Sequence, residues 1–148
     1  CRHDAGLQKN DALAIVADAT ASKDANTFPL MHASIRRGLF LEYIGAEDNQ
    51  SELRDELFIT GAFSLLDRIT GAPFNQLFEL ISLSENVVDA VVKKEGPYAP
   101  YLQLIEAVER SDPLAIQKRL DELALPVATC NEALLRAMAS ANTLDSEL

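Results

Sequence analysis

Two histidines, His3 and His32, give this sequence its widest choice of chemistry, because imidazole serves as a metal ligand and as a general base. His3 precedes Asp4, a residue pair found in metal-dependent phosphohydrolases of the His-Asp class. Those enzymes need several ligands from different helices, because the metal is held while one position stays open for water. One dipeptide and one further histidine fall short of that set. We predict no metal site, and keep a phosphohydrolase remnant with His3, Asp4 and His32 as ligands as an alternative.

Cys130 and a pair of glutamates give no stronger catalytic pattern. Cys130 falls at a predicted helix start, where its pKa would be lowered, but no histidine lies near it in the sequence to act as a base. Glu106 and Glu109 share a helix face, and we interpret them as a solvated acidic surface. No glycine-rich phosphate loop is present. The sequence therefore predicts no catalytic, cofactor-binding or metal-binding residue, no cofactor and no enzymatic activity.

The charge balance disfavours nucleic acid and membrane partners. The chain has 13 Lys and Arg against 23 Asp and Glu, a formal net charge of −10 that repels phosphate backbones and anionic bilayers. A helix-turn-helix DNA-binding regulator stays a second alternative, because the last two predicted helices are long and basic doublets occur. These doublets are Arg36-Arg37, Lys93-Lys94 and Lys118-Arg119. From Ser111 onward, however, three basic residues stand against six acidic ones, so we interpret those helices as packing elements.

Length and composition are those of a globular domain. We expect one domain over residues 1–148, since 148 residues with 48% hydrophobic content suffice for a core. No apolar run reaches the roughly 18–20 residues that a membrane span needs. The two cysteines form no CxxC pair and no signal-peptide pattern is present, which favours a cytoplasmic location. Because the chain opens at Cys1 without a methionine, we expect it to be a fragment of a longer polypeptide.

The hydrophobic periodicity predicts an all-α fold of about seven to eight helices. The expected helices run from Asn10 or Asp11 to about Ser22, from Pro29 to Ile44, from Ser51 to Gly71, from Pro73 onward, from Ser84 to Gly96, from Tyr98 to Val108, from Asp112 to Pro126, and from a Thr129–Glu132 capping box onward. Four valines in the Ser84 segment would suit a strand, but their two-wide stripe at helical spacing favours helix. Residues 142–148 are expected to be a frayed tail.

The helix that begins at Pro29 is apolar on nearly every side, which predicts a central position. The next helix carries the most continuous apolar stripe of the chain, and we expect this stripe to be buried against the central helix. The stripe consists of Phe58, Leu65, Leu66 and Ile69.

Arg37, on the central helix, needs a carboxylate to be tolerated in a partly buried site. Asp67 needs compensation too, because it is placed near the C-terminal end of its predicted helix, where the macrodipole disfavours an acid. We therefore predict an Arg37–Asp67 pair. The alternative is that Asp67 is solvated or caps the turn between Gly71 and Pro73.

One string in the sequence resembles a known family. Phe58-Ile-Thr-Gly-Ala-Phe-Ser-Leu-Leu-Asp-Arg-Ile-Thr-Gly-Ala-Pro73 is similar to the later part of the HDOD (HD-related output) domain. The similarity extends from about Pro29 to Arg110. Further matching residues are Ile35 to Arg37, Leu41-Glu42, Leu83-Ser84, the Gly96 turn, Leu102, Leu104, Ala107 and Glu109. The chain thus looks like the C-terminal part of an HDOD domain of the kind attached to EAL-type cyclic-di-GMP signalling proteins.

The resemblance implies a helical domain related in shape to HD phosphohydrolases but without their metal ligands. It implies a non-catalytic regulatory or output module of a bacterial signal-transduction protein, acting through contacts with a protein partner or with other domains of the same polypeptide. Any cyclic-di-GMP phosphodiesterase activity would then belong to an upstream EAL domain.

Overall fold

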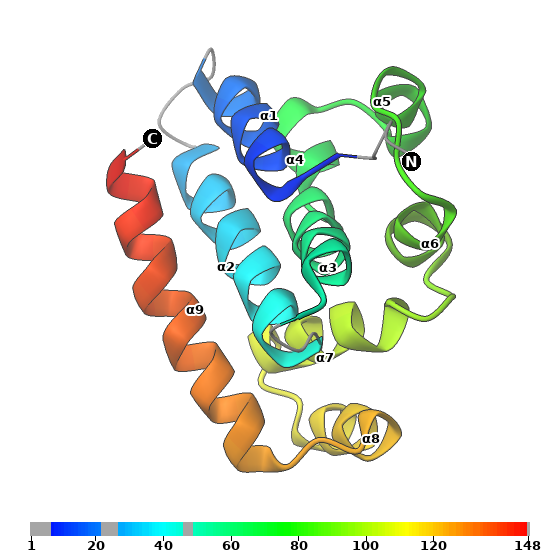
Figure 1. The fold of residues 1–148 in the computed structure, drawn as a ribbon, viewed down its shortest axis with the longest axis vertical. Helices are drawn as coiled ribbons and strands as arrows, with labels where there is room; N and C mark the ends of the chain where they lie inside the picture. Colours follow the sequence, from blue (N-terminus) through cyan, green and yellow to red (C-terminus); the bar gives the residue numbers. More distant parts are fainter. Residues whose placement is uncertain (1–6, 22–26, 46–48, 148) are drawn as a thin grey trace.

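The computed structural model describes residues 7–21, 27–45 and 49–147, and all regular structure within these ranges is helical, as predicted. The helices, shown in Figure 1, are α1 (Lys9–Ala21), α2 (Phe28–Gly45), α3 (Ser51–Phe63), α4 (Leu66–Thr70), α5 (Phe74–Leu80), α6 (Glu85–Val88), α7 (Ala99–Glu109), α8 (Pro113–Leu123) and α9 (Val127–Glu147). A π-helical segment, Asp89–Lys93, continues α6. Within the described ranges, no helix combines the length and apolar character that a bilayer crossing requires.

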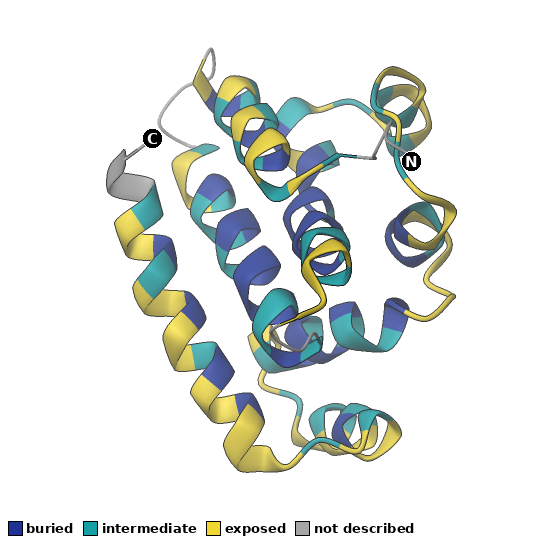
Figure 2. Cartoon of the chain, in the orientation of Figure 1, coloured by how far each residue is buried: buried dark blue, intermediate teal, exposed yellow. Residues whose placement is uncertain are grey.

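Helix α2 occupies the centre of the molecule. It lies between α3 and α9 (Figure 1) and also contacts α1, α4 and α7. Figure 2 shows that α2 is coloured as buried or intermediate along nearly all of its length. The central position was expected, because a helix that is apolar on nearly every side must be covered by several neighbours.

Glycines allow α2 and α3 to approach each other closely. A Cβ atom added to Gly61 of α3 would lie 2.5 Å from the main-chain oxygen of Arg37. A Cβ added to Gly38 of α2 would lie 2.7 Å from the ring of Phe58. The two helix backbones therefore meet at this crossing, and only residues without a side chain fit there.

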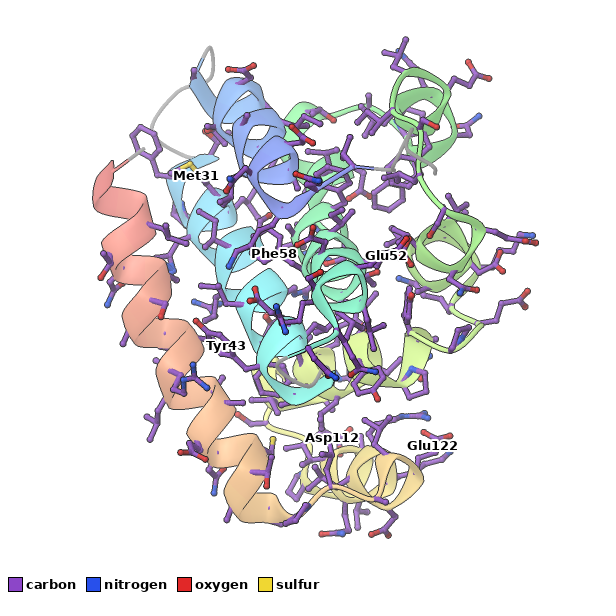
Figure 3. The ribbon with its side chains drawn as sticks, in the orientation of Figure 1. Met31, Tyr43, Glu52, Phe58, Asp112 and Glu122 are labelled. Carbon is purple, nitrogen blue, oxygen red and sulfur yellow. The ribbon has the colours of Figure 1, made fainter. Side chains whose placement is uncertain are left out.

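The predicted core stripe is confirmed. Phe58, which Figure 3 labels, is fully buried, and Leu65, Leu66 and Ile69 are exposed by no more than 3%. All four lie on α3, on α4 or at the junction between these helices, and both helices contact α2. This stripe belongs to the buried hydrophobic core of the molecule.

The single helix predicted from Ser51 to Gly71 is instead two helices. Helix α3 ends at Phe63, where the Ser64 hydroxyl donates to the carbonyl oxygen of Gly61 at 2.7 Å. A serine that hydrogen-bonds a preceding carbonyl competes with the helical ladder, and the chain turns before α4 begins. The predicted end at Gly71 is confirmed, with a φ of 76°.

The valine-rich segment is helical, as predicted. The Ser84 hydroxyl caps it by accepting from the Val87 amide at 3.4 Å. The helix ends earlier than Gly96, because Lys94 already takes the left-handed conformation, with a φ of 61°. Asp112 likewise caps α8, as predicted, by accepting from the Ala115 amide at 3.2 Å.

Two predictions about the last helix are wrong. Helix α9 begins at Val127, so Thr129 lies inside its first turn and forms no capping box with Glu132. The helix also continues to Glu147, where a frayed tail was expected from residue 142. Tertiary packing explains the extension, since Ala141 is buried and Leu144 packs against the core. Leu148 lies outside the described residues.

Candidate functional site

The Arg37 guanidinium forms the principal polar cluster between helices. Arg37 projects from α2, and its side chain is only 7% exposed. Its Nε donates to both carboxylate oxygens of Glu109, at 3.2 and 3.1 Å, and its Nη2 donates to Oε1 at 2.6 Å. A forked, charge-assisted contact of this kind is among the strongest hydrogen bonds in proteins. It ties α2 to the end of α7.

Two further groups complete this cluster. The Nη1 of Arg37 donates to the Ser64 hydroxyl at 2.9 Å, and Glu106 Oε2 lies 3.7 Å from the same nitrogen. Ser64 stands at the break between α3 and α4, so Arg37 holds this junction together with α7. Arg36 adds a longer contact, 4.0 Å, to Glu109. The cluster therefore joins α2, α7 and the α3–α4 junction.

The predicted Arg37–Asp67 pair is wrong. Because α4 starts at Leu66, Asp67 lies in the first turn of a helix, where the macrodipole favours an acid, and not near a C-terminal end. Its carboxylate accepts from the Arg68 amide at 2.8 Å. Arg37 does pair with a carboxylate, as expected, but Glu109, 72 residues away in the sequence, supplies it.

The interpretation of Glu106 and Glu109 as a merely solvated face is also wrong. Their side chains are 24% and 25% exposed and face the Arg37 guanidinium. The crowding of two like charges on one helix face is relieved by the arginine between them. Two features of the sequence could have indicated this contact. They are the helical spacing of the two acids and the presence of Arg37 on an apolar helix.

The other candidate residues are not brought together into a site. His32 has both ring nitrogens engaged, with Asn142 Oδ1 at 2.8 Å from Nε2 and Arg36 Nη1 at 3.3 Å from Nδ1. His3 and Asp4 lie outside the described residues. Across the parts of the chain that the structure describes, no three His, Cys, Asp or Glu side chains are grouped to hold a metal ion.

The pKa of the Cys130 thiol is shifted in the direction opposite to the one expected. Cys130 lies in the first turn of α9 and is buried, and burial raises the pKa of its thiol, whereas a helix start was expected to lower it. Desolvation disfavours the thiolate, so the shift has the sign opposite to that of an activated nucleophile.

A cleft of about 390 Å³ opens beside the Arg37 cluster. It is lined by Arg37, Arg68, Lys94, Glu106, Glu109 and Arg110. Four cationic side chains thus surround two carboxylates, in a chain whose net charge is strongly negative. No sequence pattern predicted this cleft, because its residues come from α2, α4, α7 and the end of the π-helical segment.

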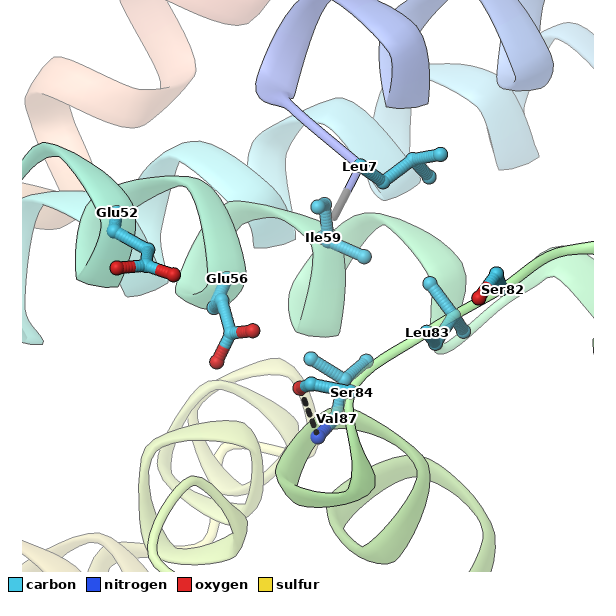
Figure 4. Close-up of a pocket in the computed structure, with 8 residues that line it drawn as sticks. All are labelled: Leu7, Glu52, Glu56, Ile59, Ser82, Leu83, Ser84 and Val87. Atoms are coloured by element: carbon cyan, nitrogen blue, oxygen red, sulfur yellow. Dashed lines mark hydrogen bonds between the residues drawn. The ribbon is translucent and has the colours of Figure 1, made fainter. Parts of the chain in front are cut away.

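A second cavity, of about 290 Å³, lies between α3 and the extended chain before α6 (Figure 4). Glu52 and Glu56 project from α3 on one side of it, and Ser82 and Ser84 face them from the other. Glu56 accepts a hydrogen bond from the Tyr98 hydroxyl at 2.5 Å. Burial and this carboxylate raise the pKa of Tyr98 well above its usual range. Glu56 therefore has a structural partner at the edge of the cavity.

The chain is similar to a bacterial signalling protein. The chain is 25% identical over 126 residues to the cyclic di-GMP phosphodiesterase CdgJ of Vibrio cholerae serotype O1. The alignment covers 85% of this chain but 28% of the relative, so the chain spans less than a third of that protein's length. No protein-family model matches the chain, and no solved structure matches it.

Proposed function

We propose that this chain is a non-catalytic regulatory module of a bacterial cyclic-di-GMP signalling protein, similar to the C-terminal part of an HDOD domain. It acts through contacts with another domain of the same polypeptide or with a protein partner, in the cytoplasm. The observation that carries the proposal is the similarity to a cyclic di-GMP phosphodiesterase, which covers most of this chain and a minor part of the relative. That pattern fits one module of a larger signalling protein.

The use of the polar side chains supports a structural and regulatory role. Glu109 is engaged with Arg37, Glu56 with Tyr98, and His32 with Asn142 and Arg36. The contacts of Glu109 with Arg37, Glu56 with Tyr98 and His32 with Asn142 join distant parts of the chain, while that of His32 with Arg36 lies within α2. The groups that could serve as acids, bases or ligands therefore hold elements of the fold in place.

The first experiment measures hydrolysis of cyclic di-GMP by the purified chain with Mg²⁺ or Mn²⁺. We expect product to form no faster than without protein. Elemental analysis of the same sample is the companion measurement, because a phosphohydrolase remnant would retain a transition metal. Stoichiometric tightly bound metal, or hydrolysis by the chain alone, would contradict the proposal.

The second experiment uses the polypeptide that carries the module. Its phosphodiesterase rate is compared with that of a version lacking these 148 residues, and the purified chain is then added back in trans. We expect removal to change the rate or its response, and addition of the chain to reverse the change. Identical rates in all three samples would reject a regulatory role.

A further inference from the structure

The cleft beside Arg37 holds basic side chains that the fold does not neutralise. Arg68, Lys94 and Arg110 are exposed at its edge. Among the described residues, Arg68 and Lys94 form no ion pair, and Arg110 has one contact, 3.9 Å to Asp112. Arg37, by contrast, is satisfied by Glu109. Arg68 and Lys94 at the edge are therefore available to a ligand, and Arg110 is held by one long contact at an exposed position.

The position of these cations indicates what kind of anion fits. Lys94 follows the π-helical segment and Arg110 follows α7, so the cleft lies at helix C-terminal ends, where the helix dipole is partly negative. Compact phosphate sites instead use main-chain amides at helix N-termini. Glu106 and Glu109 within the cleft repel any anion placed between them, so an anionic ligand pairs with the cations at the edge.

The backbone fixes where two of the cations are placed. Lys94 itself has a φ of 61°, and Ser111, which follows Arg110, has a φ of 54°. Residues other than glycine seldom take this conformation, so each turn has a defined direction. Arg68 approaches from α4, a third element. The cations are thus distributed around an opening and do not converge on one point.

We propose that this cleft binds an extended acidic peptide segment, whose carboxylates pair with Arg68, Lys94 and Arg110. The segment belongs to the domain or protein that the module contacts, and in this respect the inference rests on the proposed function. Charge complementarity carries it: most of the chain repels an acidic segment, while the cleft presents a local excess of positive charge.

The test measures binding of a labelled peptide of alternating Glu and Ser residues to the purified chain by fluorescence anisotropy at low salt. The same peptide with Gln in place of Glu is the ligand control. We expect binding of the Glu peptide only, weakening as salt is added, because exposed charge pairs are screened. Equal binding of both peptides, or none by the Glu peptide, would overturn the inference.

The protein variants locate the binding site. Arg68→Gln, Lys94→Asn and Arg110→Gln together remove three charges from the cleft, and asparagine suits the left-handed position of Lys94. The matched control removes three charges from α8 and α9, with Lys118→Gln, Arg119→Gln and Arg136→Gln. We expect the cleft variant to bind about tenfold or more weakly and the control to bind nearly normally. Equal weakening in both would show a non-specific charge effect and overturn the inference.

Two further readouts distinguish peptide binding at the cleft from misfolding and from phosphate binding. Circular dichroism and the thermal midpoint check that the cleft variant folds, since cations also stabilise helix C-terminal ends. If the cleft variant unfolds, each single substitution is tested for binding in turn, and unchanged binding in all three rejects the site. Competition by pyrophosphate at lower concentration than the Glu peptide would show a phosphate site instead.

The cleft assignment and the proposed regulatory function can fail independently of each other. If the peptide binds at the cleft but the variant leaves the intact polypeptide's phosphodiesterase rate and response unchanged, the cleft assignment stands and its regulatory use fails. If removal of the module changes that rate but the cleft variant binds the Glu peptide normally, the regulatory function stands and the cleft assignment fails.

Discussion

Arg37 is nearly buried on an apolar helix, so the free energy of its charge depends on its partners. Removing an ion from water is costly, and the loss is offset only where hydrogen bonds replace the water. Glu109 and Ser64 provide those bonds, and Glu106 adds a nearby negative charge. Loss of one partner leaves the other charge poorly solvated, which makes the pair a sensitive point of stability.

A double-mutant cycle with Arg37→Met and Glu109→Gln measures this contact. We expect each single variant to lower the free energy of unfolding, and a coupling energy of about 1–3 kcal/mol between them, because the contact is forked and largely shielded from water. Urea denaturation of the four proteins gives the values. The pair Arg37→Met and Asp67→Asn is the control, with expected coupling near zero. A coupling of Arg37 to Asp67 and not to Glu109 would contradict the structure.

The raised pKa of Tyr98 predicts that the folded protein loses stability at alkaline pH. Its pKa is raised in the folded protein above the ordinary value of 10.0, because burial and Glu56 disfavour the phenolate. A raised pKa contributes stability that is fully present below pH 10.0 and falls as the pH rises above that value, because the unfolded chain then loses its proton first. Tyr98→Phe should flatten this fall. Denaturation at a series of alkaline pH values measures it, and an equally steep fall in the variant would show that Tyr98 is not responsible.

At the scale of elements, the crossing of α2 and α3 depends on the absence of two side chains. The main chain of Arg37 lies against Gly61, so the ion-pair cluster and the glycine contact share one turn of α2. The distance between α2 and α3 at this point therefore also fixes the position of the Arg37 main chain, from which the guanidinium extends to Glu109. Packing and charge placement are thus linked through the same residues.

Gly61→Ala tests this spacing. Alanine favours an isolated helix by about 1 kcal/mol over glycine, but here its Cβ would lie 2.5 Å from a main-chain oxygen that cannot move alone. We expect a net destabilisation of about 1–3 kcal/mol by chemical denaturation. Gly45→Ala is the matched control, because its Cβ would meet the end of the flexible Leu57 side chain and should cost less. A Gly61→Ala protein as stable as wild type would show that the helices separate easily.

For the whole molecule, the features that depend on neighbouring residues in the sequence were predicted correctly. The caps at Ser84 and Asp112 and the helix end at Gly71 follow from short-range hydrogen bonding, and each was predicted correctly. The central place of α2 followed from its apolar surface, because burial on several sides is the one way to cover such a helix.

The features that were missed depend on distant parts of the chain. The partner of Arg37 lies 72 residues away, and no periodicity within a helix points to it. The break at Ser64 accompanies a hydrogen bond from Arg37, which belongs to another helix. The basic cleft combines residues from four elements, so its charge cannot be recognised before the fold is known.

Helix α9 covers α2 mainly with small side chains, and this has a consequence for hydrogen exchange. Ala133, Ala137 and Ala141 are buried, yet each removes little apolar area from water, so α9 is attached less firmly than α3. Partial opening should therefore release α9 before the rest of the molecule, and its amides should exchange faster than those of α2 and α3. Native-state exchange followed by NMR measures this order, and equal protection in α9 and α3 would contradict it. Each such opening would expose, for a moment, the apolar face of α2 that α9 covers.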